Sequence, residues 1–277
     1  MTTQDIKTKE TRPNAATLRG LHVQGLCAGY GKALVLENLD LFVPEGQVVA
    51  VVGPNGAGKS TLVKAAAALV DRSTGSVRVD TQDVAKMDPR ARARAIGYLP
   101  QDATVHWNIV ARDVVALGRL PHIGAHAAPS PADHAAVERA MHDTETLHLA
   151  DRPVGELSGG ERARVLLARV LAGEPRWLLA DEPLASLDPS HQIDLLARLR
   201  GYALGRAGVA IVLHDLVQAQ RAADDALLLA DGRVVAFGPV EEVMTAETLG
   251  RVFGVRVAPL DDGKRRLLVP VGRIDIG

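Results

Sequence analysis

The sequence predicts an α/β protein: a mostly parallel sheet with flanking helices, an antiparallel β subdomain and an inserted α-helical subdomain. Three observations predict this class. Valine-rich residues 48–52 form a continuous apolar run, typical of a parallel strand buried on both faces, and a glycine-rich turn and a helix-forming run follow. Two more apolar runs, 176–180 and 209–213, end in polar residues. Residues 34–43 alternate in polarity, whereas 110–150 show short helical stretches broken by proline and glycine.

Composition limits the class of function. The 277 residues are 47% hydrophobic and 23% charged, which is ordinary for a soluble globular protein. A net charge of −1 argues against nucleic-acid binding through bulk positive charge, so we expect no nucleic-acid partner. The single cysteine, Cys27, permits no intramolecular disulfide. The N-terminus is polar and no apolar run reaches the ~18 residues of a membrane span, so we expect a cytoplasmic protein whose membrane role comes through a partner.

The first part of the chain predicts a tail and two strands. Residues 1–19 are polar without periodicity, as in a disordered tail. Two β-like stretches follow between 21 and 43 and end at a Pro-Glu-Gly turn. Tyr30 lies between them beside two glycines. It is either a partly buried turn residue or a platform that stacks on a base.

The stretch after the valine-rich strand carries the strongest motif. The spacing from Gly53 to Gly58, Lys59 and Ser60 fits G-x-x-x-x-G-K-[ST], the P-loop. Glycines let the backbone wrap an anion so that N–H groups at a helix start face phosphates. Lys59 would reach the β- and γ-phosphates and the Ser60 hydroxyl would bind Mg²⁺. The sequence therefore predicts a nucleotide site.

Past the P-loop helix we expect a strand at 76–80, a basic helix at 83–95 and a strand at 96–100 that ends at Gln101. A helical insert follows. It holds six histidines, whose spacings form no compact ligand set and which no cysteine accompanies, so we expect solvated surface histidines rather than a metal site. They are His106, His122, His126, His134, His142 and His148.

Two further phosphate-ready features follow the insert. Ser158, Gly159 and Gly160 open a long helix with a nest of backbone N–H groups, although an ordinary capped helix would show the same pattern. The apolar strand 176–180 then ends in Asp181 and Glu182. Carboxylates at the end of a parallel strand lie where ligands bind in such sheets; Asp181 would hold Mg²⁺ and Glu182 would orient the attacking water.

The remainder predicts one more site residue and three terminal elements. His214 ends the strand 209–213 on the same sheet edge, where it is either a capping residue or a sensor of the γ-phosphate. Residues 226–237 predict a hairpin around Asp-Gly, 240–253 a helix, and 255–271 a second hairpin.

In this order the motifs resemble those of the nucleotide-binding subunits of ATP-binding cassette (ABC) transporters, over about residues 21–253. The resemblance implies a P-loop NTPase core that binds ATP and Mg²⁺ and hydrolyses ATP. It makes Glu182, His214 and Gln101 catalytic, and adds Gln101 to Ser60 and Asp181 as a magnesium residue. The nucleotide-binding residues that it implies are Tyr30, Gly53, Pro54, Asn55, Gly56, Ala57, Gly58, Lys59, Ser60, Thr61, Ser158, Gly159, Gly160 and Asp188. Glu161 and Leu184 depart from the commoner glutamine and threonine or serine.

The resemblance also implies organisation and partners. We expect a tail at 1–19, an ABC ATPase domain at 20–254 with a helical insert at about 102–172, and a C-terminal β-hairpin extension at 255–277. Two copies would face head to tail, with each ATP between one P-loop and the partner's LSGG. The insert would dock transmembrane permease subunits, with exposed arginines Arg112 and Arg119 on its surface, at the cytoplasmic face of the bacterial inner membrane; a solute-binding protein would take part indirectly.

Residues 117–122 (LGRLPH) look like the insert of importers for metal chelates such as siderophore-iron, haem or cobalamin. The main hypothesis is the ATPase subunit of such an importer. Two alternatives stay open: an importer ATPase for zinc or manganese, and a soluble, non-transport ABC protein. A P-loop kinase would leave LSGGE and His214 unexplained.

Overall fold

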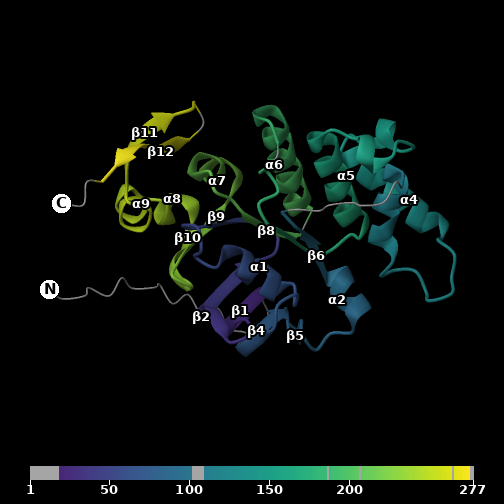
Figure 1. Cartoon of the computed structure of the whole chain (residues 1–277), viewed down its shortest axis with the longest axis horizontal. Helices are drawn as coiled ribbons and strands as arrows, with labels where there is room; N and C mark the ends of the chain where they lie inside the picture. Colours follow the sequence, from purple (N-terminus) through teal and green to yellow (C-terminus); the bar gives the residue numbers. More distant parts are fainter. Residues whose placement is uncertain (1–18, 102–108, 186, 206, 264, 275–277) are drawn as a thin grey trace.

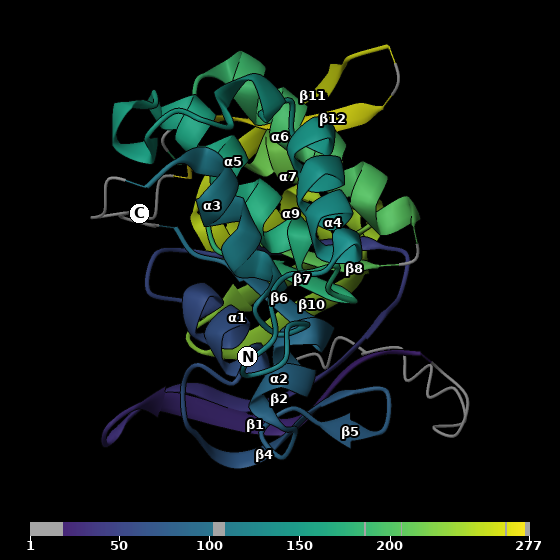
Figure 2. The same ribbon diagram turned by 90° about the vertical axis from the view of Figure 1, so that its right-hand side faces the viewer.

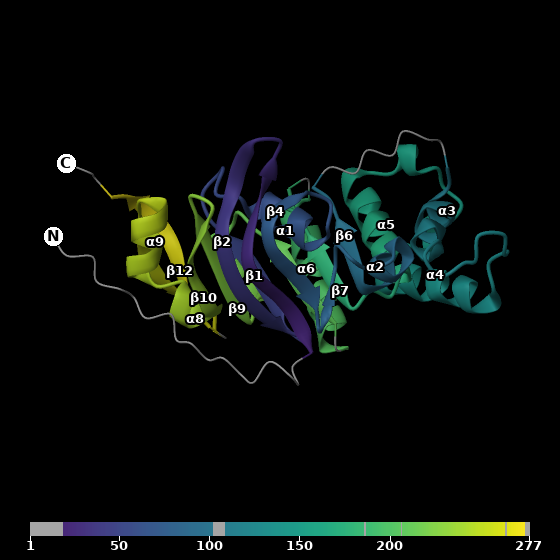
Figure 3. The ribbon, with the colours of Figure 1, turned by 90° about the horizontal axis from the view of Figure 1, so that it is seen from below.

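The computed structural model describes residues 19–101, 109–185, 187–205, 207–263 and 265–274. The tail predicted for residues 1–19 lies outside this part of the chain except for Arg19, as do His106 and Ser186. Along the longest axis, a C-terminal hairpin stands at one end, the helical insert at the other, and the sheets lie between them (Figures 1 and 3).

A six-stranded sheet forms the centre of the molecule. Its order is β10-β9-β3-β8-β7-β6, and the four junctions from β9 to β6 are parallel, whereas β10 pairs antiparallel with β9. The predicted mostly parallel sheet is thereby confirmed. The strands are β3 Val48–Val52, β6 Ile96–Leu99, β7 Trp177–Ala180, β8 Gly208–Val212, β9 Asp225–Ala230 and β10 Arg233–Pro239.

An antiparallel sheet of order β2-β1-β4-β5 lies beneath the central sheet, at the bottom of Figure 2. Its last two strands differ from the sequence expectation. β4 begins earlier than residue 76, because its polar first half pairs with the bulged middle of β1. Asp83, expected to begin a helix, instead pairs with Arg78 of β4 as part of the short strand β5. The strands are β1 Gly20–Tyr30, β2 Ala33–Pro44, β4 Arg72–Val79 and β5 Gln82–Asp83.

β3 explains why the fold has two cores. All five of its residues are buried. Val48, Ala50 and Val52 face a core shared with the helices of the insert and with α6 and α7, whereas Val49 and Val51 face a core shared with α1 and the antiparallel sheet. A strand covered on both faces needs apolar residues at every position, which is why it shows as an unbroken apolar run. α1 is Lys59–Ala66, α6 is Pro189–Leu204 and α7 is Leu216–Ala222.

The helices around β6 bring the insert to the sheet. α2 (Pro89–Ala95) is shorter than predicted, because the Asp88 carboxylate caps it and Pro89 occupies its first position. α2 runs directly into β6. The insert consists of α3 Ala111–Ala116, η1 Leu117–Arg119, α4 Pro131–Asp143, η2 Leu147–Leu149, η3 Val154–Glu156 and α5 Gly159–Ala172.

The chain ends in two helices and a hairpin. The structure has two helices, α8 (Val240–Val243) and α9 (Ala246–Phe253), where one was predicted at 240–253. The Thr245 side chain caps the start of α9 by accepting a hydrogen bond from Thr248 N–H. β11 (Val255–Asp261) and β12 (Arg266–Arg273) pair antiparallel, as the predicted hairpin requires. Among the described residues, no helix is long and apolar enough to cross a bilayer.

Candidate active site

The P-loop joins β3 to α1 with three positive-φ glycines. Gly53, Gly56 and Gly58 have φ values of 157°, 80° and 96°. A side chain at Gly53 would stand 2.2 Å from the Leu229 carbonyl oxygen of β9, so the loop lies too close to the sheet for a Cβ. The Lys59 ammonium donates to the Gly53 and Pro54 carbonyls, both at 2.9 Å. The backbone of the loop thus surrounds the Lys59 ammonium.

Lys59 is a buried cation in an acidic setting. It is 5% exposed. Burial lowers the pKa of its ammonium, while the charges of Glu182 and then Asp181 oppose that shift. The site therefore concentrates one cation and two carboxylates at the end of the central sheet.

Asp181 is held from α1 and from β6. It is 1% exposed, and a carboxylate so buried needs partners. The Ser60 hydroxyl donates to Oδ1 at 2.7 Å, the Tyr98 hydroxyl donates to Oδ2 at 3.3 Å, and Lys64 Nζ lies 3.9 Å from Oδ2. Sequence reasoning missed Tyr98 and Lys64, although Lys64 stands four residues after Ser60 and hence on the same helix face.

Glu182 joins two of the other predicted residues. His214 Nε2 lies 2.5 Å from its Oε1, and the Gln101 amide donates to its Oε2 at 2.6 Å. The backbone of Glu182 has φ = 49°, in the left-handed region that a non-glycine residue adopts at a cost. Three strand ends, those of β6, β7 and β8, thus deliver Gln101, Glu182 and His214 to one point.

Ser158 and Gly160 lie apart from this cluster. Ser158 caps α5 through a capping box: its hydroxyl accepts from Glu161 N–H at 3.3 Å, and its own N–H donates to the Glu161 carboxylate at 2.9 Å. A Cβ on Gly160 would stand 3.4 Å from the His191 ring of α6. His191 Nδ1 in turn lies 3.3 Å from the Asp188 carboxylate. The start of α5 and Asp188 therefore meet through His191, a residue that the sequence did not single out.

Tyr30 ends β1 and pairs in register with Ala33. Its side chain is 51% exposed, which leaves the ring free to meet a planar ligand. The base-stacking role of Tyr30 stays a prediction.

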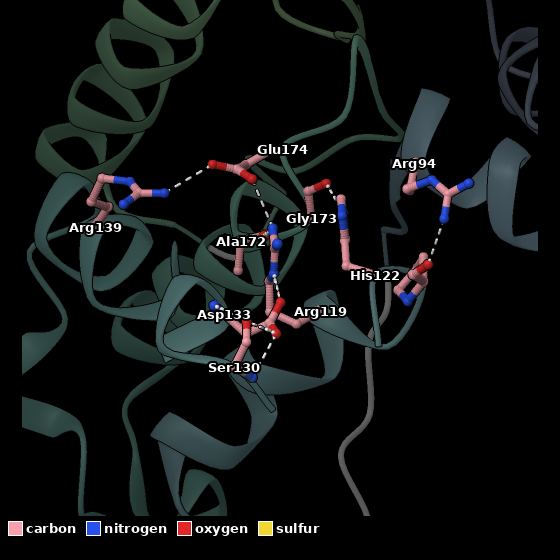
Figure 4. Close-up of polar contacts among 10 residues, drawn as sticks. Arg94, Arg119, His122, Ser130, Asp133, Arg139, Ala172, Gly173 and Glu174 are labelled. Carbon is pink, nitrogen blue, oxygen red and sulfur yellow. Dashed lines mark hydrogen bonds and ion pairs between the residues drawn. The ribbon is translucent and has the colours of Figure 1, made fainter. Parts of the chain in front are cut away.

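The expectation that Arg119 is exposed was wrong. Arg119 is 7% exposed, because it closes a polar cluster between α4 and α5 (Figure 4). Arg112 has 47% of its side chain exposed, as expected. His122, one of the predicted surface histidines, is half-buried and its Nε2 lies 2.9 Å from the Gly173 carbonyl. Within the described residues no group of three metal-ligating side chains is present.

Comparison with known proteins identifies a matching family and two relatives of similar length. Residues 36–185 match the family model described as ABC transporter. The chain is 42% identical over 268 residues to the ferric enterobactin transport ATP-binding protein of Escherichia coli (strain K12), covering 94% of this chain and 96% of that protein. It is 43% identical over 262 residues to a hemin import ATP-binding protein of Myxococcus xanthus (strain DK1622), covering 91% and 97%.

A solved structure agrees with both relatives. An inward-facing metal-chelate type ABC transporter superposes with a TM-score of 0.80 at 28% identity, covering 91% of this chain and 98% of that chain.

Proposed function

We propose that this chain, which belongs to the ABC transporter family, hydrolyses ATP to drive an importer of metal chelates such as siderophore-iron, haem or cobalamin. One observation carries the proposal. The P-loop lysine, the Ser60–Asp181 pair and the Glu182–His214–Gln101 group all lie where the central parallel strands end. The similarity to the ferric enterobactin and hemin proteins supports the class of cargo.

The proposed nucleotide contacts follow from the loop. Backbone N–H groups from Gly53 to Thr61 cradle the phosphates, and the Lys59 ammonium leaves its loop carbonyls to pair with the β- and γ-phosphates. Tyr30 stacks on the adenine. Ser158, Gly159, Gly160 and Asp188 face the ATP of a second copy, which accounts for a second phosphate-ready helix start beside a single P-loop.

The oxygens of Ser60 and Asp181 fit Mg²⁺, because a hydroxyl and a buried carboxylate 2.7 Å apart are hard donors of the kind that this ion prefers. Gln101 would complete the set. Bound there, the ion would neutralise charge on the β- and γ-phosphates. Tyr98 and Lys64 hold the Asp181 carboxylate in place from the side.

Hydrolysis then depends on Glu182. Its carboxylate orients and polarises the water that attacks the γ-phosphate, with His214 and Gln101 on either side to contact that phosphate. Both neighbours touch Glu182, so the three side chains form one group at the ends of the strands. The departures at Glu161 and Leu184 stand outside this group: Glu161 closes the α5 capping box, and Leu184 is buried in the core.

The proposed assembly places the chain at the cytoplasmic face of the bacterial inner membrane. The insert, about residues 102–172, docks a permease; the ATPase domain spans 20–254, with 255–277 as an extension. A solute-binding protein delivers the cargo to the permease.

Co-purification of the tagged full chain from cells that encode it tests this proposal. The expected result is a polytopic membrane protein in stoichiometric amount, with loss of haem or ferric-siderophore uptake when the chain is deleted. Recovery of ribosomes without a membrane protein would contradict transport, and loss of zinc or manganese uptake alone would contradict the cargo class.

A further inference from the structure

Arg119 lies at the end of α5 that is far from Ser158. Its Nη1 donates to the Ala172 carbonyl and to the Glu174 carboxylate, both at 2.8 Å, and its Nε donates to Asp133 at 2.9 Å. Ala172 is the last residue of α5, and Asp133 belongs to the capping box of α4. One buried guanidinium thus hydrogen-bonds both the C-terminus of α5 and the N-terminus of α4 (Figure 4).

The neighbours of Arg119 press on the same end of α5. A Cβ on Gly118 would stand 2.0 Å from the Arg169 carbonyl oxygen, so the backbone of η1 lies directly on the helix. His122 reaches the Gly173 carbonyl at 2.9 Å. The segment from Leu117 to His122 therefore packs on the C-terminal end of α5 and holds it in place. From the sequence, this segment showed only a resemblance to the insert of metal-chelate importers.

Residues 117–122 also contact α2, which leads through β6 to Gln101. Arg94 of α2 donates to the Pro121 carbonyl at 2.9 Å, and α2 continues into β6 and then Gln101. On β6 itself, a Cβ on Gly97 would stand 2.6 Å from Val170 of α5. The C-terminal end of α5 thus lies between residues 117–122 and β6, the strand that leads to Gln101.

From these contacts we propose that Arg119 is a positioning residue, which fixes the direction of α5 and so the place where Ser158, Gly159 and Gly160 meet the nucleotide of a second copy. This rests on the proposed function. A helix of 14 residues is about 21 Å long, so a tilt of about 5° at the Arg119 end moves the Ser158 end by about 2 Å. Misplacement of about 1 Å can cost on the order of 10²-fold in rate.

The hydrogen-bond geometry of Arg119 and the charge of Glu174 show why arginine is needed at this position. The fork of the guanidinium satisfies Ala172, Glu174 and Asp133 together, which the single ammonium of a lysine does not do. Burial would raise the pKa of Glu174, yet its hydrogen bonds from Arg119 and Arg139 keep that pKa below its ordinary value. The Glu174 carboxyl is therefore ionised at neutral pH.

Arg119→Lys in the full chain tests the proposal, with Arg139→Met as the matched control. Arg139 bonds the same Glu174 at 3.0 Å from the exposed surface but touches neither Ala172 nor Asp133. Fluorescent mant-ATP binding reports the P-loop of one copy, and specific ATPase activity over a range of protein concentrations reports the encounter of two copies.

We expect Arg119→Lys to keep the mant-ATP Kd within about twofold and to lose about tenfold or more in activity at low protein concentration, with partial recovery at high concentration. Arg139→Met should match the parent in both. Glu174→Gln, at a half-exposed position, should show a smaller loss in the same direction.

Three results would overturn the positioning role. Arg119→Lys and Glu174→Gln could both match the parent at every concentration. Affinity, activity and Tm could instead fall together, which would mark a general packing role. Arg139→Met could show the same loss as Arg119→Lys. By contrast, a parent whose specific activity did not rise with protein concentration would contradict the two-copy arrangement of the proposed function itself.

Discussion

Single residues at this site are held by contacts from elements far apart in the chain. Glu182 follows β7, yet its carboxylate meets Gln101 after β6 and His214 after β8. Asp181 likewise joins α1 and β6 through Ser60 and Tyr98. Parallel strands bring their carboxyl ends to one edge, and for this reason Gln101 and His214, more than 100 positions apart, meet at one carboxylate.

Sequence patterns predicted most of these residues but missed some of their partners. Asp181 and His214 were found because each ends an apolar run. Tyr98 was not, because a tyrosine inside a strand is ordinary core material and its hydroxyl partner lies 83 residues away. Arg119 was placed on the surface because arginine is mostly exposed; its burial depends on Asp133 and Glu174, whose proximity only the packed helices create.

At the residue scale, Tyr30→Ala tests base stacking. The exposed ring at the end of β1 is expected to contribute roughly 1–3 kcal/mol to nucleotide binding, by analogy with base–aromatic stacking. Isothermal titration with ATP should therefore show a Kd raised by about 5- to 150-fold, while Tyr30→Phe, which keeps the ring, stays near the parent. Discrimination between ATP and GTP should change little, because every base has a π-face. Equal affinity in the alanine variant would remove Tyr30 from the site.

Among the elements, the sequence predicted the strands around the P-loop correctly, whereas it predicted the ends of the helices less accurately. β3 and β8 are unbroken apolar runs, and burial on both faces leaves no other pattern possible. α2 was predicted too long, and α8 and α9 were predicted as one helix. In both cases a side-chain cap, Asp88 or Thr245, starts a helix later than its composition suggested. Such a cap sets a helix boundary through only one or two hydrogen bonds, which is a weaker sequence signal than periodicity.

The start of α4 yields a pH prediction. Hydrogen bonds from Ser130 and then Arg119 hold the pKa of the Asp133 carboxyl well below its ordinary value. Because the folded pKa is depressed, the stabilisation is complete above the unfolded pKa of about 3.9 and declines as pH falls below it toward the folded pKa. Asp133→Asn should lower the Tm at pH 7, and its difference from the parent should shrink as the pH is taken below about 4.

Glu138→Gln serves as the control for this experiment, since Glu138 is exposed on the same helix. It should follow the parent across the whole pH range. An Asp133→Asn difference that stayed constant down to pH 3 and below would show that the carboxylate charge is not what stabilises the start of α4.

On the scale of the whole molecule, the proposed ATP hydrolysis and the proposed docking of a permease belong to different parts of the chain. The central sheet holds the P-loop, Asp181 and Glu182, whereas the insert at the opposite end from the C-terminal hairpin presents Ser158 and the surface proposed for the permease (Figure 1). The sequence resemblance supplied this division, and composition or periodicity alone did not. The number of copies and the docking partner lie beyond a single chain, because those contacts involve residues of other molecules.

The rate of ATP hydrolysis by Glu182→Gln tests the central claim most directly. Glutamine keeps the size and one acceptor of the side chain but removes the charge, so MgATP should bind with a normal Kd. Loss of a general base typically costs on the order of 10²–10⁴-fold in rate, and we expect single-turnover hydrolysis to slow by this amount. Glu247→Gln, on the exposed face of α9, should hydrolyse ATP at the parental rate. A Glu182→Gln protein that binds MgATP and hydrolyses it as fast as the parent would contradict the catalytic site described here.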